Sequence, residues 1–156
     1  MGINSDQELL NTLKSIKAGK LTEENKIDLL TLFINTKSYS IQDQIAIIFG
    51  EANFDFAIPY IFAKIRDKIN YNHTGTLVYS LDYFDMKPYL KELIEIILEQ
   101  GYESKIMAYN LIKEFSLLLS EDEKQRNLIN LIKIRNKLKN DIDTLDIVDK
   151  TIGLLN

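Results

Sequence analysis

The amino-acid sequence predicts an all-α protein, an α-solenoid of antiparallel helix pairs with about eight or nine helices. Three observations support this prediction. Every segment longer than ten residues has apolar residues at helical spacing. No stretch shows sustained two-residue alternation of apolar and polar residues, so strands are not expected. Two stretches of the chain also coincide when one is shifted by the 32 residues that separate Ile45 from Leu77.

The internal repeat is carried by apolar positions. In the first copy, the run 45–49 is followed by Ile58, Ile61, Phe62 and Ile65. In the second copy, the run 77–81 is followed by Leu90, Leu93, Ile94 and Ile97. A repeat of this length is a helix pair that cannot bury its apolar face alone, so it is expected to stack on a neighbouring pair.

The first two helices are predicted from their capping residues. Residues 4–6 (Asn-Ser-Asp) cap a first helix that stops near Gly19. Thr22 opens the second helix, with Glu23 and Glu24 in the first turn, where the helix dipole favours acids. The buried stripes are expected at Leu9, Leu13 and Ile16 and at Ile27, Leu30 and Ile34.

The central helices are bounded by proline, glycine and polar residues. Ser40 starts a third helix that ends near 50–53, and a fourth spans about 55–67 with Pro59 in its first turn. After the polar break at 70–75, a fifth helix covers 76–84, with Leu77, Leu81 and Phe84 facing inward. A sixth covers 87–99, with Pro88 at its start and Gly101 just past its end.

Three more helices complete the chain. The seventh carries an inward stripe, Ser120 caps an eighth that runs to about Lys139, and Asp143 or Thr144 caps the last. The stripes are Ala108, Leu111, Ile112 and Phe115; Leu128, Leu131, Ile132 and Leu138; and Leu145, Val148, Ile152 and Leu155. Because the connections are short, consecutive helices should be antiparallel neighbours in a single domain over residues 1–156.

Composition is that of an ordinary globular protein. The 156 residues are 46% hydrophobic and 27% charged, with a net charge of −4 and no cysteine. Disulfides and thiolate metal sites are therefore excluded. No secretory signal is visible, and no apolar run approaches the ~20 residues of a membrane span. These features predict a cytoplasmic protein that binds neither membrane nor, given its negative charge, nucleic acid directly.

Little in the sequence points to catalysis. The single histidine, His73, lies in the polar break and is expected to be a loop or cap residue, with a partner contact as the alternative. One histidine cannot build a metal site with partners of its own kind, and no triad spacing or phosphate-binding glycine pattern accompanies it. We therefore expect no enzyme activity, no metal and no cofactor.

An acidic segment is the most suggestive feature of the surface. Six acids and two bases lie between Asp82 and Glu103, a local charge of −4. Glu92, Glu95 and Glu99 are spaced to share one outward face of their helix. Candidate partner-binding residues are Tyr79, Asp82, Tyr83, Asp85, Glu92, Glu95, Glu99 and Glu103. The alternative is a solvated helix face with tyrosines that pack at its edge.

A basic cluster follows in the eighth-helix region. It consists of Lys133, Arg135, Lys137 and Lys139. Cations at a helix C-terminus are favoured by the macrodipole, which is the structural explanation. Contact with a phosphate or nucleic acid is the minor alternative.

Two resemblances emerge from these segments. Residues 44–51 (QIAIIFGE) and 57–61 (AIPYI) resemble the two helices of a HEAT repeat. The next unit departs from the pattern, since Asp82 replaces the glycine and the proline has moved to Pro88; a weaker third copy begins near Ala108. The resemblance covers about 40–120 and implies an α-solenoid. Residues 74–81 (TGTLVYSL) with Phe84 and Asp85 are similar to small bacterial HEAT-like proteins, some of which neutralise toxins.

These features predict a bacterial immunity protein that covers the basic active-site surface of a toxin, such as a nuclease, with its own acidic face. One alternative is a general HEAT-like scaffold or regulatory protein with another protein partner. An enzyme resembling bilin lyases or DNA-alkylation glycosylases is the third. The enzyme fits poorly, because the net charge disfavours duplex binding and the chain has no tryptophan for base stacking.

Overall fold

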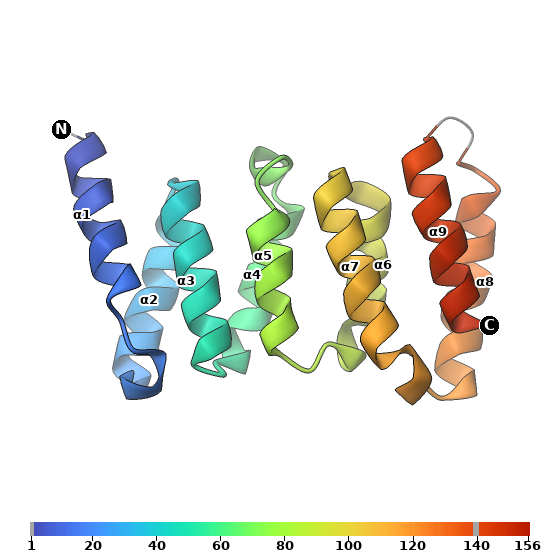
Figure 1. The fold of residues 1–156 in the computed structure, drawn as a ribbon, viewed down its shortest axis with the longest axis horizontal. Coiled ribbons are helices and arrows are strands. Elements are labelled where there is room, and N and C mark those ends of the chain that lie inside the picture. The colour runs from blue at the N-terminus through green and yellow to red at the C-terminus, as the bar shows by residue number, and fades with distance from the viewer. Residues whose placement is uncertain (1, 139–140) are drawn as a thin grey trace. The chain divides into compact units, whose positions relative to one another are not determined.

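The computed structural model describes residues 2–138 and 141–156, with side chains from Ser5 onward, and within them every regular element is helical (Figure 1). The prediction of an all-α protein is confirmed. The chain divides into two compact units, Met1–Phe84 (unit 1) and Asp85–Asn156 (unit 2). Each unit is described by itself, and the single domain stays a prediction.

Unit 1 is built around one central helix. Its helices are α1 (Gly2–Lys14), α2 (Glu23–Asn35), α3 (Tyr39–Glu51), α4 (Ile58–Arg66) and α5 (Gly75–Ser80), with 3₁₀ turns η1 (Ala18–Lys20), η2 (Asp55–Ala57), η3 (Lys68–Asn70) and η4 (Leu81–Tyr83). Helix α3 packs against α1, α2 and α5. Its Ile45, Ala46 and Phe49 are fully buried and form the centre of the core.

Unit 2 consists of η5 (Lys87–Tyr89), α6 (Leu90–Glu99), α7 (Tyr102–Phe115), η6 (Ser116–Leu118), α8 (Glu121–Arg135) and α9 (Ile142–Leu155). Helix α7 packs against both α6 and α9, and α8 packs against α9. Leu93, Ile97, Ile112, Leu131 and Val148 are fully buried in the core of this unit.

The two copies of the internal repeat cover corresponding helical elements of the structure. The first copy covers α3, η2 and α4, and the second covers α5, η4, η5 and α6. The stripe residues of α4 and α6 are all buried, as predicted: Ile58, Ile61, Phe62, Ile65, Leu90, Leu93, Ile94 and Ile97. The boundary between the two units, at Phe84 and Asp85, falls inside the second copy.

Two predicted helix starts are confirmed by their capping bonds. The Thr22 hydroxyl accepts a hydrogen bond from the Asn25 backbone N–H (3.1 Å), and the Asn25 side chain accepts from Thr22 N–H in return (3.2 Å). Ser120 and Glu123 form the same reciprocal pair at the start of α8.

The buried stripe of α2 differs from the prediction. Ile27 and Ile34 are 49% and 45% exposed, whereas Leu29, Leu30 and Phe33 are buried. Two apolar stripes overlap in this helix, and the stripe with the larger side chain is the one that is buried. The Phe33 ring packs edge-on against Phe49 of α3, with centroids 5.6 Å apart.

Some helix boundaries are also corrected. Helix α1 begins at Gly2, before the predicted cap at 4–6, and ends at Lys14, so that the predicted end near Gly19 falls in the separate turn η1. The Asn4 side chain lies outside the described residues. Helix α9 is capped by Asp141, not by Asp143 or Thr144, since the Asp141 carboxylate accepts from Thr144 N–H (3.0 Å).

Helix α8 ends at Arg135, and the predicted end at Lys139 lies outside the described residues. Of its predicted stripe, Leu128 and Leu131 are buried, but Ile132 is 43% exposed and Leu138 is half-buried. The inward face of α8 is therefore narrower than predicted.

Candidate functional site

Two exposed tyrosines lie side by side in unit 1. Tyr79 on α5 and Tyr83 on η4 have ring centroids 6.3 Å apart, with the ring planes perpendicular. Their side chains are 49% and 40% exposed. The two residues are four positions apart in nearly helical chain, so both rings emerge on one face.

Gly50 of α3 allows Tyr83 to approach this closely. A Cβ atom at Gly50 would lie 2.6 Å from the Tyr83 ring, which is shorter than any normal contact. The ring therefore covers the α3 backbone at a position where no side chain fits. Sequence comparison within the repeat marks Gly50 as a helix-end glycine, but the partner that lies on it could not be predicted.

Two carboxylates adjoin the tyrosines. Asp82 and Glu51 are both exposed. Partial desolvation of the Tyr83 hydroxyl raises its pKa above the usual value, and Tyr79, Glu51 and, least, Asp82 add to that rise. We call Tyr79, Tyr83, Asp82 and Glu51 the tyrosine patch.

The predicted carboxylate row on α6 is less exposed than expected. Glu99 and, on α7, Glu103 are exposed, but Glu92 and Glu95 are half-buried. Ile96, one turn after Glu92 on the same face, is 3% exposed. Helix α6 carries apolar residues around most of its circumference and packs on α7 and α9, so its glutamates are partly covered.

Asp85 has a local structural role in unit 2. It is exposed, and its carboxylate accepts a hydrogen bond from the Lys87 backbone N–H (3.1 Å), at the start of η5. The candidate residues thus form two groups. Tyr79, Asp82 and Tyr83 are brought together in unit 1, whereas Asp85, Glu92, Glu95, Glu99 and Glu103 belong to unit 2.

Asp43 on α3 has a shifted pKa, and the sequence analysis did not identify it as a candidate residue. Burial raises its pKa to about 6, while a hydrogen bond with Thr76 and the charge of His73 act in the opposite direction. Its Oδ1 atom is buried with no hydrogen-bond partner among the described residues. In the sequence, the one indication of this group is that an aspartate stands between two isoleucines, Ile41 and Ile45, which are both buried in the structure.

His73 lies in the turn before α5, as predicted, and is exposed. Its ring stacks on Tyr39, with centroids 3.8 Å apart and planes 11° from parallel. The Tyr39 hydroxyl donates to the Ile69 carbonyl (3.2 Å). These contacts fix the turn to the start of α3, which is a structural role.

The basic cluster at the end of α8 is partly engaged within unit 2. Arg135 makes a bidentate pair with Asp149 of α9, which raises the pKa of Arg135 and lowers that of Asp149. Lys133 and Lys137 are exposed, and Lys139 lies outside the described residues.

A buried lysine joins α7 to the start of α9. Lys105 is 7% exposed, donates to the Thr144 hydroxyl, and lies 3.8 Å from the Asp141 carboxylate. Burial lowers the pKa of Lys105, against the opposing charges of Asp141 and Asp143. The network fixes the N-terminus of α9, and sequence spacing gave no sign of it.

In the part of the chain that the structure describes, no group of three metal-ligating side chains is present, and no helix is both long and apolar enough to cross a bilayer. Comparison with known proteins gives no match to any family model, curated protein or solved structure.

Proposed function

We propose that this protein is a non-catalytic binding module that recognises a basic surface of a protein partner through the tyrosine patch. The observation that carries the proposal is the pair of exposed, perpendicular tyrosine rings flanked by Asp82 and Glu51. Tyrosine is enriched at interface hot spots, because its rigid ring buries a large area with little loss of side-chain entropy.

The chemistry of the patch favours a cationic partner. An arginine side chain can lie over an exposed tyrosine face while its guanidinium pairs with a neighbouring carboxylate. The acidic groups would also speed association with a positively charged surface.

We further propose that the helices form a HEAT-like α-solenoid of antiparallel pairs. The 32-residue offset between Ile45 and Leu77 supports this arrangement, as does the packing of α3 between α1 and α5. Stacked helix pairs present extended surfaces, which suits a protein whose role is binding.

The partner that we propose is a toxin domain, and the protein is then an immunity protein. The similarity of 74–81 and Phe84-Asp85 to small bacterial HEAT-like proteins, some of which neutralise toxins, supports this choice. A nuclease toxin needs a basic surface to hold phosphates, and an acidic protein bound there would occlude it.

The proposal is tested by co-expression with the product of the adjacent upstream gene. We expect that product to arrest growth alone and the wild-type protein to restore growth. The double variant Glu51→Lys/Asp82→Lys should fail to restore growth, because it reverses both carboxylates of the tyrosine patch. Glu114→Lys, an exposed substitution on α7, is the matched control and should protect as wild type does.

A non-toxic upstream product, with no stable complex on co-purification, would contradict the immunity role. Full protection by Glu51→Lys/Asp82→Lys would contradict the assignment of the surface. Circular dichroism of each variant establishes that loss of protection is not loss of folding, since exposed charges contribute little to stability.

A further inference from the structure

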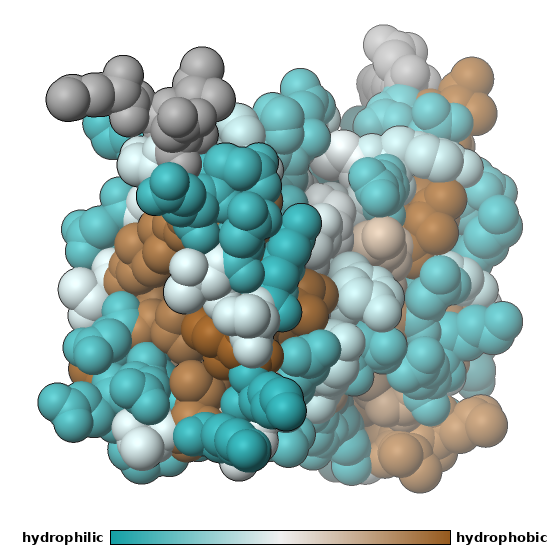
Figure 2. Space-filling model, turned by 60° about the vertical axis from the view of Figure 1, so that its left-hand side comes forward, coloured by the Kyte–Doolittle hydropathy of each residue, from teal (hydrophilic) through white to brown (hydrophobic). Residues whose placement is uncertain are grey.

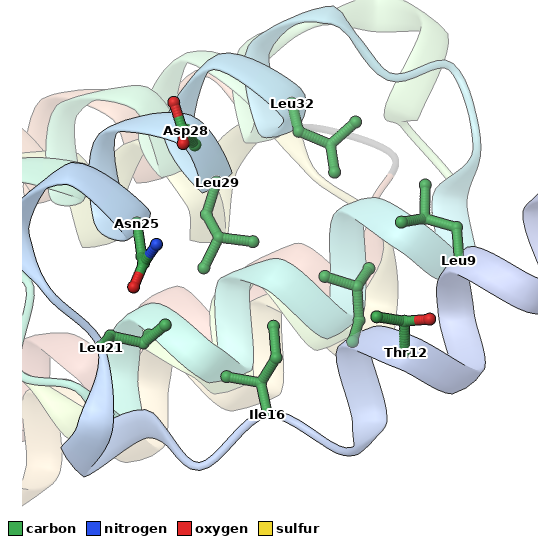
Figure 3. Close-up of a pocket in the computed structure, with 9 residues that line it drawn as sticks. Leu9, Thr12, Ile16, Leu21, Asn25, Asp28, Leu29 and Leu32 are labelled. Atoms are coloured by element: carbon green, nitrogen blue, oxygen red, sulfur yellow. The ribbon is translucent and has the colours of Figure 1, made fainter.

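A groove opens between α1 and α2 in unit 1. It has a volume of about 420 Å³ and is lined by Leu9, Thr12, Leu13, Ile16, Leu21, Asn25, Asp28, Leu29 and Leu32 (Figure 3). Leu9 of α1 and Leu29 and Leu32 of α2 point into it from opposite sides, and Ile16 and Leu21 come from the connection between the two helices. The lining is therefore mostly apolar, with polar atoms only from Thr12, Asn25 and Asp28.

The groove has a buried floor and accessible walls. Leu13 and Leu29 are 2% and 8% exposed, because both helices pack on α3. Leu9, Ile16, Leu21 and Leu32 are only half-buried. Figure 2 shows the result as hydrophobic surface on the α1 and α2 side of the unit, bordered by hydrophilic side chains. Contiguous apolar surface of this kind marks an interaction site.

The borders of the groove are acidic. Asp28 lines it, Glu24 lies one turn earlier on α2, and Glu8 lies one turn before Thr12 on α1. All three residues are exposed, and none has an ion pair within the described part of the chain. The cations Lys17 and Lys20 belong to the connection at one end of the groove and not to these two helix faces.

We propose that this groove binds an amphipathic helix of a protein partner that carries lysine or arginine beside its apolar stripe. The apolar stripe would cover Leu9, Ile16, Leu21 and Leu32, and the cations would meet the carboxylates of Glu8, Glu24 and Asp28. The α2 wall from Asn25 to Leu32 is two turns long, about 10 Å. An occupant of matching length places anchors at i, i+3, i+4 and i+7.

This inference does not depend on the proposed function, because none of its residues belongs to the tyrosine patch. The two surfaces can therefore be tested separately. Glu51→Lys/Asp82→Lys should leave binding in the groove unchanged.

The test uses a synthetic helix of about 14 residues with leucines at i, i+3, i+4 and i+7 and flanking lysines, titrated by fluorescence anisotropy. The matched peptide replaces each lysine with glutamate. We expect the lysine peptide to bind at least tenfold more tightly than the glutamate peptide. The double variant Glu24→Lys/Asp28→Lys should reverse this preference, and Leu32→Glu should abolish binding of both peptides.

Glu114→Lys is the control for charge, and chemical-shift mapping locates the bound peptide. The comparison of the two peptides uses the wild-type protein, so it tests the proposal even if the Leu32→Glu variant does not fold. The proposal fails if the two peptides bind equally, or if the shifts fall outside α1 and α2. It also fails if sedimentation shows a dimer that Leu32→Glu dissociates, since the occupant is then a second copy of this chain.

Discussion

Ionisation of the Asp43 carboxyl opposes folding. Its folded-state pKa of about 6 lies above the ordinary value of 3.8, so the folded protein holds this proton more tightly than the unfolded chain does. The contribution of Asp43 therefore becomes less favourable as pH rises from about 4 to 6 and stays unfavourable at pH 7. Sequence spacing did not predict this, because the burial that raises the pKa comes from tertiary packing.

We predict that Asp43→Asn stabilises the protein by about 1–2 kcal/mol at pH 7, a value reduced from the full shift for solvent screening. At pH 4, where the folded protein already holds the proton, the gain should disappear. Urea unfolding at the two pH values measures the difference. Asp55→Asn, at an exposed position, is the control. Equal effects of Asp43→Asn at both pH values would contradict the account.

Gly50 gives a second prediction at the residue scale. Gly50→Ala should destabilise the protein by about 1–3 kcal/mol, because its Cβ would lie 2.6 Å from the Tyr83 ring. Gly153→Ala is the matched control: that glycine is inside α9 with open space around it, so we expect a gain of about 0.5–1 kcal/mol.

Thermal denaturation compares the two glycine variants. In the double variant Gly50→Ala/Tyr83→Gly, the second substitution removes both the ring and the Cβ atom of Tyr83, which the new Cβ at position 50 would otherwise meet at 2.6 and 2.7 Å, so the two effects should be non-additive. Strict additivity would mean that the Tyr83 side chain is not what makes Gly50 necessary.

At the scale of the element, the start of α8 depends on one reciprocal cap. Hydrogen bonds from Ser120 lower the pKa of Glu123 below its usual value. Glu123 therefore contributes stability above pH 4.5, and that contribution is lost as pH falls through its lowered folded-state pKa. Ser120→Ala should reduce stability by about 0.5–2 kcal/mol.

Hydrogen exchange of the first turns of α8 measures this effect locally. Ser40→Ala on α3 is the control, because Ser40 is exposed and inside a helix. Protection of α8 that is unchanged in Ser120→Ala would contradict the role of the cap.

The elements show which features of this chain can be predicted from sequence. Thr22 and Ser120 act on residues three positions away, so local spacing identified both helix starts. The inward face of α2 could not be chosen in this way, because two stripes overlap and the contact of Phe33 with Phe49 decides between them. Asp141 was missed as the cap of α9, although its bond to Thr144 spans the same three positions, because Asp143 and Thr144 are equally good caps by spacing and the Asp141 carboxylate is also held by the distant Lys105.

At the scale of the whole molecule, only some of the acidic residues that the sequence places in one charged segment lie fully exposed on the surface. The acidic segment from Asp82 to Glu103 includes Glu92 and Glu95, which helix packing half-buries, and Asp85, which binds a backbone N–H. The tyrosine patch adds Glu51, from a different helix 31 positions before Asp82 in the chain. Residues so far apart in the sequence become neighbours only through the packing of α3 against α5 and η4.

The dissociation constant of the complex with the co-expressed basic protein tests the central claim most directly. We predict that Glu51→Lys/Asp82→Lys weakens binding at least tenfold, that Glu114→Lys does not, and that added salt weakens wild-type binding more than binding of the double variant. Equal dissociation constants for all three proteins, with the same salt dependence, would contradict recognition through the tyrosine patch.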